Sequence, residues 1–335
     1  MRLLCLVIAL WAPMPAAAQD HSPILDDVTQ QHILPRFAQL SEAAQQLQSA
    51  AVADCAPNAP TLRMAYGAAF DEWVLASHLR FGPTEVDDRA FAMAFWPDTK
   101  GFTPKALSQL IAAKDAAVHD PEAFAETSVA GRGFFALEQL LFDPQFADED
   151  AKYRCALVQA ITTDISRNAA AMQTDWQGYA VVLTQPGENS PYRTDEEALQ
   201  ELFKALSSGL QFTSEARLGR PLGTFDRPRP NRAEARRSNR SLRHVALSLI
   251  SLRDLGASLS VDHPGIAEDL SQAFDKAIAR AQSLDDPALA GVAIPQGRLR
   301  VEALQQSIND IRAIVATDLG PTLGINAGFN SLDGD

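Results

Sequence analysis

Apolar residues recur at helical spacing along nearly the whole of this 335-residue sequence. In the stretch 62–81, for example, Phe70, Trp73 and Val74 follow the i, i+3, i+4 rule and would share one helical face. No run alternates apolar and polar residues with enrichment in β-branched side chains, which is the pattern of a half-buried strand. The sequence therefore predicts an all-α fold. The core residues predicted for 62–81 are Met64, Phe70, Trp73, Val74 and Leu79.

A turn-rich stretch interrupts the helical pattern near the middle of the chain. Residues 183–195 contain Gln-Pro-Gly-Glu-Asn-Ser-Pro and show no periodicity, which is typical of a loop or linker. We therefore expect two helical bundles, 19–182 and 196–335, joined by this linker. In the second bundle, helices are expected near 196–217, 233–255, 266–284 and 299–318.

The first residues have the pattern of a secretory signal peptide. Arg2 precedes an apolar run from Leu3 to Trp11, and Ala16-x-Ala18 fits a cleavage site that would remove residues 1–18. The apolar run is well below the roughly 20 residues that a membrane-spanning helix needs. We expect an exported protein of the periplasm or cell envelope, with no transmembrane span in the mature chain.

Two cysteines, Cys55 and Cys155, remain once the segment containing Cys5 is removed. An even number of cysteines in an oxidising compartment favours a disulfide. The bond would close a loop of 100 residues and contribute on the order of 4–5 kcal/mol through chain entropy. Two buried thiols are the alternative.

Acidic residues outnumber basic ones by 42 to 29, which gives a formal net charge of −13. Removal of residues 1–18 takes away Arg2 and no acidic residue, so the charge becomes −14. Bulk charge of this sign argues against binding to nucleic acid or to anionic lipid. We expect no nucleic-acid partner.

One carboxylate, Glu138, lies inside the most apolar helical run of the chain. By the i, i+3, i+4, i+7 rule it shares a helical face with Phe134, Leu137 and Leu141, and the run starts at Gly133. A buried carboxylate is costly unless it meets a cation, a metal or several donors. Glu138 is therefore a candidate contact to a ligand or a metal. The alternative is a structural ion pair with Arg132, Arg80 or an arginine of the second half.

A local reversal of charge occurs in the second half. The arginines concerned are Arg227, Arg229, Arg232, Arg236, Arg237, Arg240 and Arg243. Guanidinium groups suit an anionic ligand such as a carboxylate, a phosphate or an anionic sugar. The alternative is a solvated surface that also docks onto acidic neighbours, including Glu138. Arg237 and Ser238 are the residues that we select for a ligand site.

The usual hydrolase motifs are missing from the sequence. The histidines never lie four residues apart, so there is no His-Glu-x-x-His zinc motif, and no Gly-x-Ser-x-Gly occurs. One His-x-x-Glu runs from His119 to Glu122, but Asp120 as N-cap and Pro121 in the first turn explain it as a helix start. No catalytic residue is predicted.

Several short segments, in their order and spacing, resemble the imelysin-like family of exported bacterial proteins. They are Trp73 with Arg80-Phe81-Gly82-Pro83, Phe95-Trp96-Pro97-Asp98, Gly133 to Glu138, and the stretches 202–206, 217–223, 234–238 and 328–335. The family signature is Gly-x-His-x-x-Glu. Gly133 and Glu138 match it, whereas Phe135 occupies the histidine position, as in a branch of the family that lacks this histidine.

The resemblance implies two helical-bundle domains with the motif facing the cleft, a place in the cell envelope and a role in iron uptake. We expect a non-catalytic periplasmic binding protein whose ligand touches Glu138, Arg237 and Ser238, with Gly133 and Phe135 in the same site. Iron or another divalent metal is the candidate cofactor, and envelope uptake proteins are the candidate partners. The alternatives are a degenerate metallopeptidase and an envelope scaffold without a small ligand.

Overall fold

The computed structural model of the chain describes residues 20–147 and 149–325. In this part of the chain there is no strand and 76% of the structure is helical, so the all-α prediction is confirmed. The helices of the first half are α1 (Ser22–Asp27), α2 (Leu34–Ala53), α3 (Pro60–Ala76), α4 (Arg89–Met93), α5 (Phe102–Ala113), α6 (Pro121–Ala125), α7 (Gly133–Phe142) and α8 (Ala151–Thr184). Those of the second half are α9 (Asp195–Gln211), α10 (Gly219–Leu222), α11 (Ser241–Leu259), α12 (Pro264–Ser283), α13 (Pro295–Ile314) and α14 (Gly320–Thr322).

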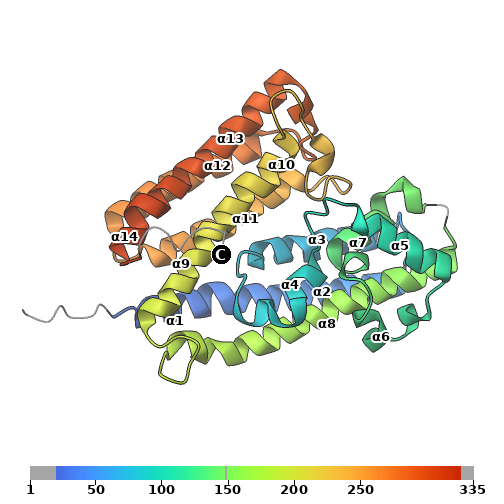
Figure 1. Cartoon of the computed structure of the whole chain (residues 1–335), viewed down its shortest axis with the longest axis horizontal. Coiled ribbons are helices and arrows are strands. Elements are labelled where there is room, and N and C mark those ends of the chain that lie inside the picture. The colour runs from blue at the N-terminus through green and yellow to red at the C-terminus, as the bar shows by residue number, and fades with distance from the viewer. Residues whose placement is uncertain (1–19, 148, 326–335) are drawn as a thin grey trace, which may run out of the picture.

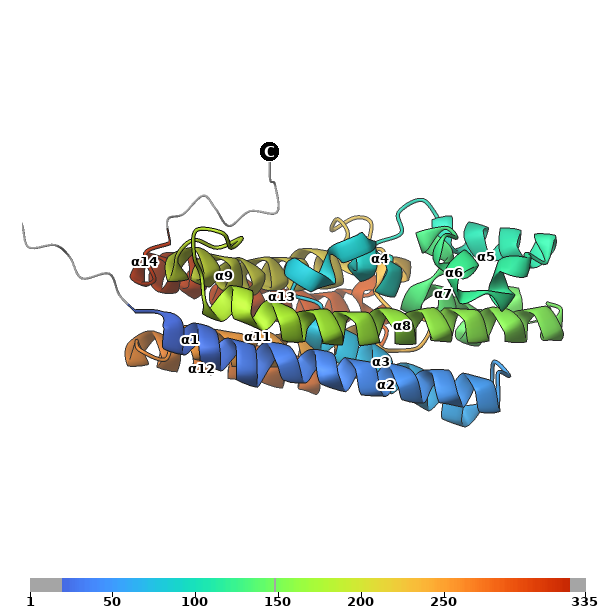
Figure 2. The same cartoon turned by 90° about the horizontal axis from the view of Figure 1, so that it is seen from below.

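The first half is built on α2 and α8, which run along each other for most of the length of the molecule (Figure 2). Helix α3 packs beside α2, and the short α7 packs against α8. Phe37 of α2 stacks on Trp176 of α8 with ring centroids 5.2 Å apart, and both side chains are fully buried. Buried aromatic pairs of this kind stabilise the contact beyond the area that they bury.

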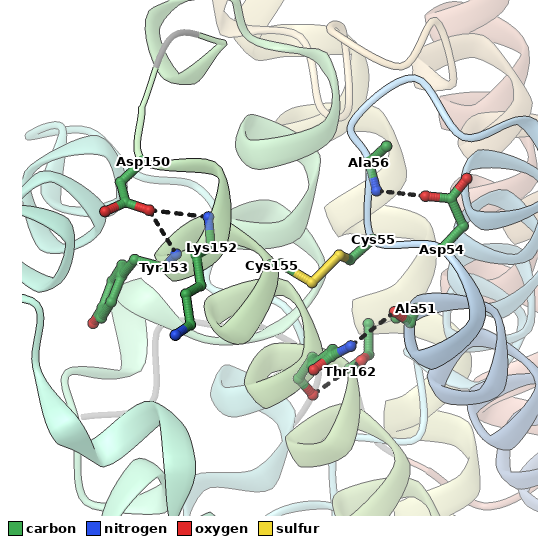
Figure 3. The surroundings of a disulfide bond; sticks show 10 residues. Ala51, Asp54, Cys55, Ala56, Asp150, Lys152, Tyr153, Cys155 and Thr162 are labelled. Atoms are coloured by element: carbon green, nitrogen blue, oxygen red, sulfur yellow. Dashed lines mark hydrogen bonds between the residues drawn. A yellow bond between two sulfur atoms is a disulfide. The ribbon is translucent and has the colours of Figure 1, made fainter.

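A disulfide fixes one end of this helix pair. Cys55, in the loop after α2, is bonded to Cys155 in α8, and their Cα atoms lie 5.2 Å apart (Figure 3). Asp150 caps α8 one turn earlier by accepting hydrogen bonds from the backbone N–H groups of Lys152 and Tyr153. The predicted pairing of the two cysteines is therefore present.

The second half packs on the first through α9 and α11. Helix α9 contacts α8, whereas α11 contacts α3 on one side and α12 on the other. Helices α12 and α13 lie on the side of the molecule away from α8 (Figure 1). The turn-rich stretch expected at 183–195 falls between the end of α8 and the start of α9. The division into two domains at this point stays a prediction.

Two local expectations from the sequence are wrong. Met64, predicted as a core residue, is 70% exposed on α3. The helix expected from Ala233 begins only at Ser241, because Ala235 and Asn239 have positive φ angles of 46° and 58°, in the left-handed region that ends a right-handed helix. Residues 233–240 therefore form a loop, and this loop carries part of the site described below.

Within the described ranges, the chain contains no helix that is long and apolar enough to cross a membrane. The predicted signal peptide, residues 1–18, lies outside the described residues.

Candidate functional site

The start of α7 depends on a glycine at position 133. Gly133 has a φ of +69°, and a Cβ atom there would overlap the backbone carbonyl oxygens of Ala92 and Met93. Only glycine combines this backbone conformation with so close an approach. The first turn of α7 therefore lies against the end of α4, which fixes the direction in which the motif side chains point.

Glu138 is buried, with 2% of its surface exposed. Its Oε1 atom accepts a hydrogen bond from the backbone N–H of Ser238 at 2.9 Å and lies 2.8 Å from the Ser238 hydroxyl oxygen, which also donates to it. Burial raises the pKa of Glu138, although the two Ser238 hydrogen bonds and the nearby Arg237 and Arg236 act in the opposite direction. No hydrogen bond reaches Oε2 from any residue in the described ranges, and Glu138 lines a pocket.

The loop at 233–240 is what brings Ser238 to Glu138. A residue inside a continuous helix would use its backbone N–H within that helix, whereas the N–H of Ser238 is free to bind the carboxylate. The neighbouring Arg237 donates from Nε to Asp143, which follows α7. Glu138, Arg237 and Ser238 thus lie together, although Arg237 pairs with Asp143 rather than with Glu138.

The alternative expectation for Glu138 was a structural ion pair with Arg132, Arg80 or an arginine of the second half. The first two of these arginines have other partners. Arg132 forms a two-pronged ion pair with Asp164, at 2.8 and 3.0 Å. Arg80 pairs with Glu85. The contact of Glu138 with the second half is made by a serine, so its negative charge is hydrogen-bonded but not directly ion-paired.

Phe135, at the histidine position of the motif, is held between aromatic rings. Its ring meets Phe70 edge-on at 5.2 Å and stacks on Trp96 at 6.2 Å with an interplanar angle of 21°. The guanidinium of Arg220 lies 5.6 Å from the centre of the Trp96 ring, within the range of a cation–π contact. Phe135, Trp96 and Arg220 therefore form a continuous stack.

Two pockets adjoin this stack, and Phe135 and Trp96 line both. The first, which we call the aromatic pocket, has a volume of about 130 Å³ and is also lined by Trp73 and Phe212. The second, which we call the arginine pocket, has a volume of about 190 Å³. Its charged lining residues are Asp98, Glu138, Arg220, Arg232, Arg236 and Arg237. Both pockets draw residues from the two halves of the chain.

A buried ionic cluster forms one wall of the aromatic pocket. Arg217 donates to Glu234 at 2.7 Å, each side chain is 5% exposed, and His244 Nδ1 lies 3.3 Å from the same carboxylate. Burial opposes ionisation of Glu234, but Arg217 and His244 outweigh it and lower the pKa of Glu234 to about 2. Arg217 and Glu234 neutralise each other, which is typical of a structural pair, whereas both ring nitrogens of His244 are buried and have no hydrogen-bond partner among the described residues.

A second buried pair touches the same pocket and was not selected from the sequence. The Nε2 atoms of His32 and His78 lie 2.9 Å apart, and His78 lines the aromatic pocket. Burial lowers the pKa of both histidines, that of His32 to about 3, so the pair is neutral at physiological pH. The two residues are 46 positions apart, and no spacing rule connects them.

The comparisons with known proteins identify the family. The Imelysin family model (peptidase M75) matches residues 33–315, and the chain therefore belongs to the imelysin family. It is 26% identical over 307 residues to Iron-regulated protein A of Synechococcus elongatus, an alignment that covers 83% of this chain and 80% of that protein.

Solved structures show the same fold. An imelysin-like protein from Psychrobacter arcticum superposes with a TM-score of 0.77 at 20% identity, covering 92% of this chain and 96% of that one. A protein assigned as an iron-regulated protein A precursor from Parabacteroides distasonis superposes with a TM-score of 0.66 at 13% identity, covering 90% and 97% of the two chains. The all-helical architecture is thus shared with both.

The residues of this site do not fit a bare metal ion. Among the described residues there is no group of three or more histidine, cysteine or acidic side chains that could hold one. Phe135 supplies no nitrogen donor, and Glu138 shares its pocket with four arginines. A divalent ion prefers several oxygen or nitrogen ligands and is repelled by guanidinium groups.

Proposed function

We propose that this chain is a non-catalytic binding component of the bacterial cell envelope, linked to the uptake of iron or a related nutrient. The ligand would lie in the arginine pocket against Glu138 and the 233–240 loop, near Arg237 and Ser238. Export to the periplasm through cleavage after residue 18, and contact with envelope uptake proteins, belong to the same proposal.

The observation that carries the proposal is the position of Glu138. Its Oε1 is held by Ser238 from the other half of the chain, its Oε2 accepts no hydrogen bond from the described residues, and the side chain lines a pocket to which both halves contribute. Pockets at such junctions, with a few polar groups set among aromatic side chains, are the usual place for a small ligand. The iron-regulated relative supports iron as the cargo, and the signal-like N-terminus supports export.

A non-catalytic role is favoured by the chemistry of the lining side chains. A metallopeptidase needs a metal held by several side chains and a water that the metal activates. Phe135 replaces the imidazole of the motif, and the sequence has neither a His-Glu-x-x-His nor a Gly-x-Ser-x-Gly motif. Arg217 and Glu234, the buried ionic pair nearby, neutralise each other.

The test is a thermal-shift and calorimetric screen of the purified mature protein. The ligands are ferrous, ferric and zinc ions, supplied free and as small organic chelates, together with a panel of small nutrients. We expect at least one iron-containing or nutrient ligand to raise the Tm of the wild type and of Glu188→Ala, a control in an exposed loop, but not of Glu138→Ala. Glu138→Ala removes the acceptor of two buried hydrogen bonds, which lowers stability by itself. Glu138→Gln, which keeps an acceptor oxygen and removes only the charge, is therefore measured beside it.

Each other outcome supports a different role. If no ligand stabilises the folded wild type, the result favours a scaffold for an envelope partner over a binding protein. Chelator-sensitive cleavage of a peptide library by the wild type would indicate a metallopeptidase. Either result would refute the binding role proposed here.

A further inference from the structure

The arginine pocket has a specific charge pattern, from which we infer that it binds a small polyanion through Arg220, Arg232 and Arg236. A second statement rests on the function proposed above: iron handled by this site would enter as an anionic complex with carboxylate or phosphate oxygens, and not as a bare ion.

The three arginines are not neutralised by the protein around them. Arg237, the fourth arginine of the pocket, is paired with Asp143. The ion pairs formed among residues 20–147 and 149–325 do not include Arg220, Arg232 or Arg236. Unpaired guanidinium groups that converge on one cavity are suited to several negatively charged oxygens.

Two of these arginines are also partly withdrawn from water. Arg220 and Arg236 are half-buried, and Arg232 is exposed at the mouth. Burial and the neighbouring Arg232 lower the pKa of Arg220, and burial and Arg237 lower that of Arg236. The Nε of Arg220 is buried and donates to no acceptor in the described part of the chain. Desolvated like charges with an unused donor are stabilised by an incoming anion.

Other polar groups of the pocket have unused hydrogen-bonding capacity. Thr103 is 2% exposed and Gln139 is 5% exposed, and both line the pocket. The Thr103 hydroxyl oxygen and the Gln139 amide oxygen are buried, and neither has a partner among the residues that the structure covers. The wall of the pocket therefore contains polar groups that the protein itself does not satisfy.

The two carboxylates of the pocket do not cancel its positive charge. Asp98 accepts hydrogen bonds from the backbone N–H groups of Phe102 at 2.9 Å and Thr103 at 2.8 Å, which cap α5 and use its oxygens. Glu138 has a raised pKa and is held by Ser238. Four guanidinium groups therefore face two carboxylates, and only one of the four, that of Arg237, is paired elsewhere, with Asp143, so the lining keeps a net positive charge even when both carboxylates are ionised.

Phe135 has a definite role in this arrangement. An imidazole three positions before Glu138 would add a nitrogen ligand for a metal on the same helix face. Phe135 instead supports Trp96, and Trp96 supports the guanidinium of Arg220. The aromatic residue at the motif position thus supplies no metal ligand and instead helps, through Trp96, to hold an arginine at the pocket.

Calorimetry on the purified mature protein, at low ionic strength and neutral pH, tests this assignment. The probes are citrate, tricarballylate and inorganic phosphate, followed by the ferric citrate complex. We expect one of the anions to bind, and Arg220→Gln or Arg236→Gln to weaken that binding by about ten- to a hundredfold, as for the loss of a charge-assisted hydrogen bond. Arg227→Gln, an exposed arginine of the same segment outside the pocket, should leave the affinity unchanged.

The outcomes separate this inference from the proposed function. Binding of a tricarboxylate alone, or of phosphate alone, supports the polyanion site and identifies its chemistry. An anion that binds while its ferric complex does not refutes the iron role but leaves the anion site standing. The inference is overturned if no probe binds at millimolar concentration, if Arg227→Gln causes the same loss, or if free zinc or ferrous ion binds more tightly than every anion. Should Arg220→Gln fail to fold, Arg232→Gln at the exposed mouth provides the same test.

Discussion

Replacement of Glu138 by glutamine and by alanine should have very different effects on stability. Alanine removes the acceptor of both the Ser238 N–H and the Ser238 hydroxyl, and it leaves space at a position that is 2% exposed. An unsatisfied buried donor costs about 1–3 kcal/mol, and loss of the side-chain contacts adds to this, so we expect about 2–4 kcal/mol in total. Glutamine keeps an oxygen at the Oε1 position, and its cost should stay within about 1 kcal/mol.

The pH dependence gives a second and independent signature. Burial raises the pKa of Glu138 above its ordinary value of 4.5, so the folded protein holds this proton at pH values where the unfolded chain has released it. The folded state then binds more protons than the unfolded state, and the free energy of unfolding falls as the pH rises above 4.5. Each pKa unit of the shift corresponds to about 1.4 kcal/mol. Glutamine has no such proton, so its stability relative to the wild type should improve as the pH rises.

Urea unfolding of the wild type, Glu138→Gln and Glu138→Ala between about pH 4.5 and 8 measures both effects. Ser238→Ala is the matched control, because it removes the hydroxyl but keeps the backbone N–H, and it should cost about 1 kcal/mol. Equal and near-zero costs for the two Glu138 variants would show that this face of α7 is exposed. A constant difference between glutamine and wild type across the pH range would refute the raised pKa.

Three further perturbations test the frame that holds the site. Gly133→Ala should lower the free energy of unfolding by at least about 3 kcal/mol, because of the positive φ and the overlap with two carbonyl oxygens. Gly178→Ala, at an exposed position of α8 with open space around it, should raise the free energy of unfolding by up to about 1 kcal/mol in the same denaturation assay. Joint replacement of Cys55 and Cys155 by serine should lower the free energy of unfolding by about 4–5 kcal/mol and abolish any response of the Tm to reductant. Glu234→Gln should cost about 3–5 kcal/mol by leaving its arginine partner uncompensated, and it should flatten the loss of stability below pH 4.5 that follows from the wild-type pKa of about 2.

The parts of the fold that the sequence predicted are those fixed by local information. The apolar period of 3.6 residues is present in each long helix, and proline or aspartate marks several starts, such as Asp120 before α6. The pairing of Cys55 with Cys155 followed from counting cysteines in an exported chain. These signals need no knowledge of what packs against what.

The errors arose where tertiary contacts decide the conformation. Residues 233–240 have helical composition, yet they form a loop. In this loop Ser238 binds Glu138, which lies 100 positions earlier in the sequence. Met64 fits a helical stripe, but none of the described elements covers it, and it is 70% exposed. Propensity is a weak prior that such contacts override. Arg220 was likewise passed over, because its importance depends on Trp96, which lies in another half of the chain.

The arginine-rich segment divides into two groups with different consequences. Arg237 pairs with Asp143, and Arg240 and Arg243 both pair with Asp71 on α3, so these three arginines dock the loop and the first turn of α11 onto the first half of the chain. Partly buried ion pairs of this geometry fix register more than they add stability.

The paired arginines also fix the positions of the unpaired ones, Arg232 and Arg236. Because the loop is already anchored to Asp143 through Arg237 and to Asp71 through Arg240, Arg236 inside the loop and Arg232 directly before it are presented to the pocket before any ligand arrives. Pre-organised groups lose little conformational entropy on binding, so affinity depends mainly on charge and fit. Asp71→Asn removes one anchor and leaves the lining of the arginine pocket unchanged, so it should weaken anion binding. The loss should appear as slower association of the anion, and it should be larger, as a free energy, than the loss in the free energy of unfolding.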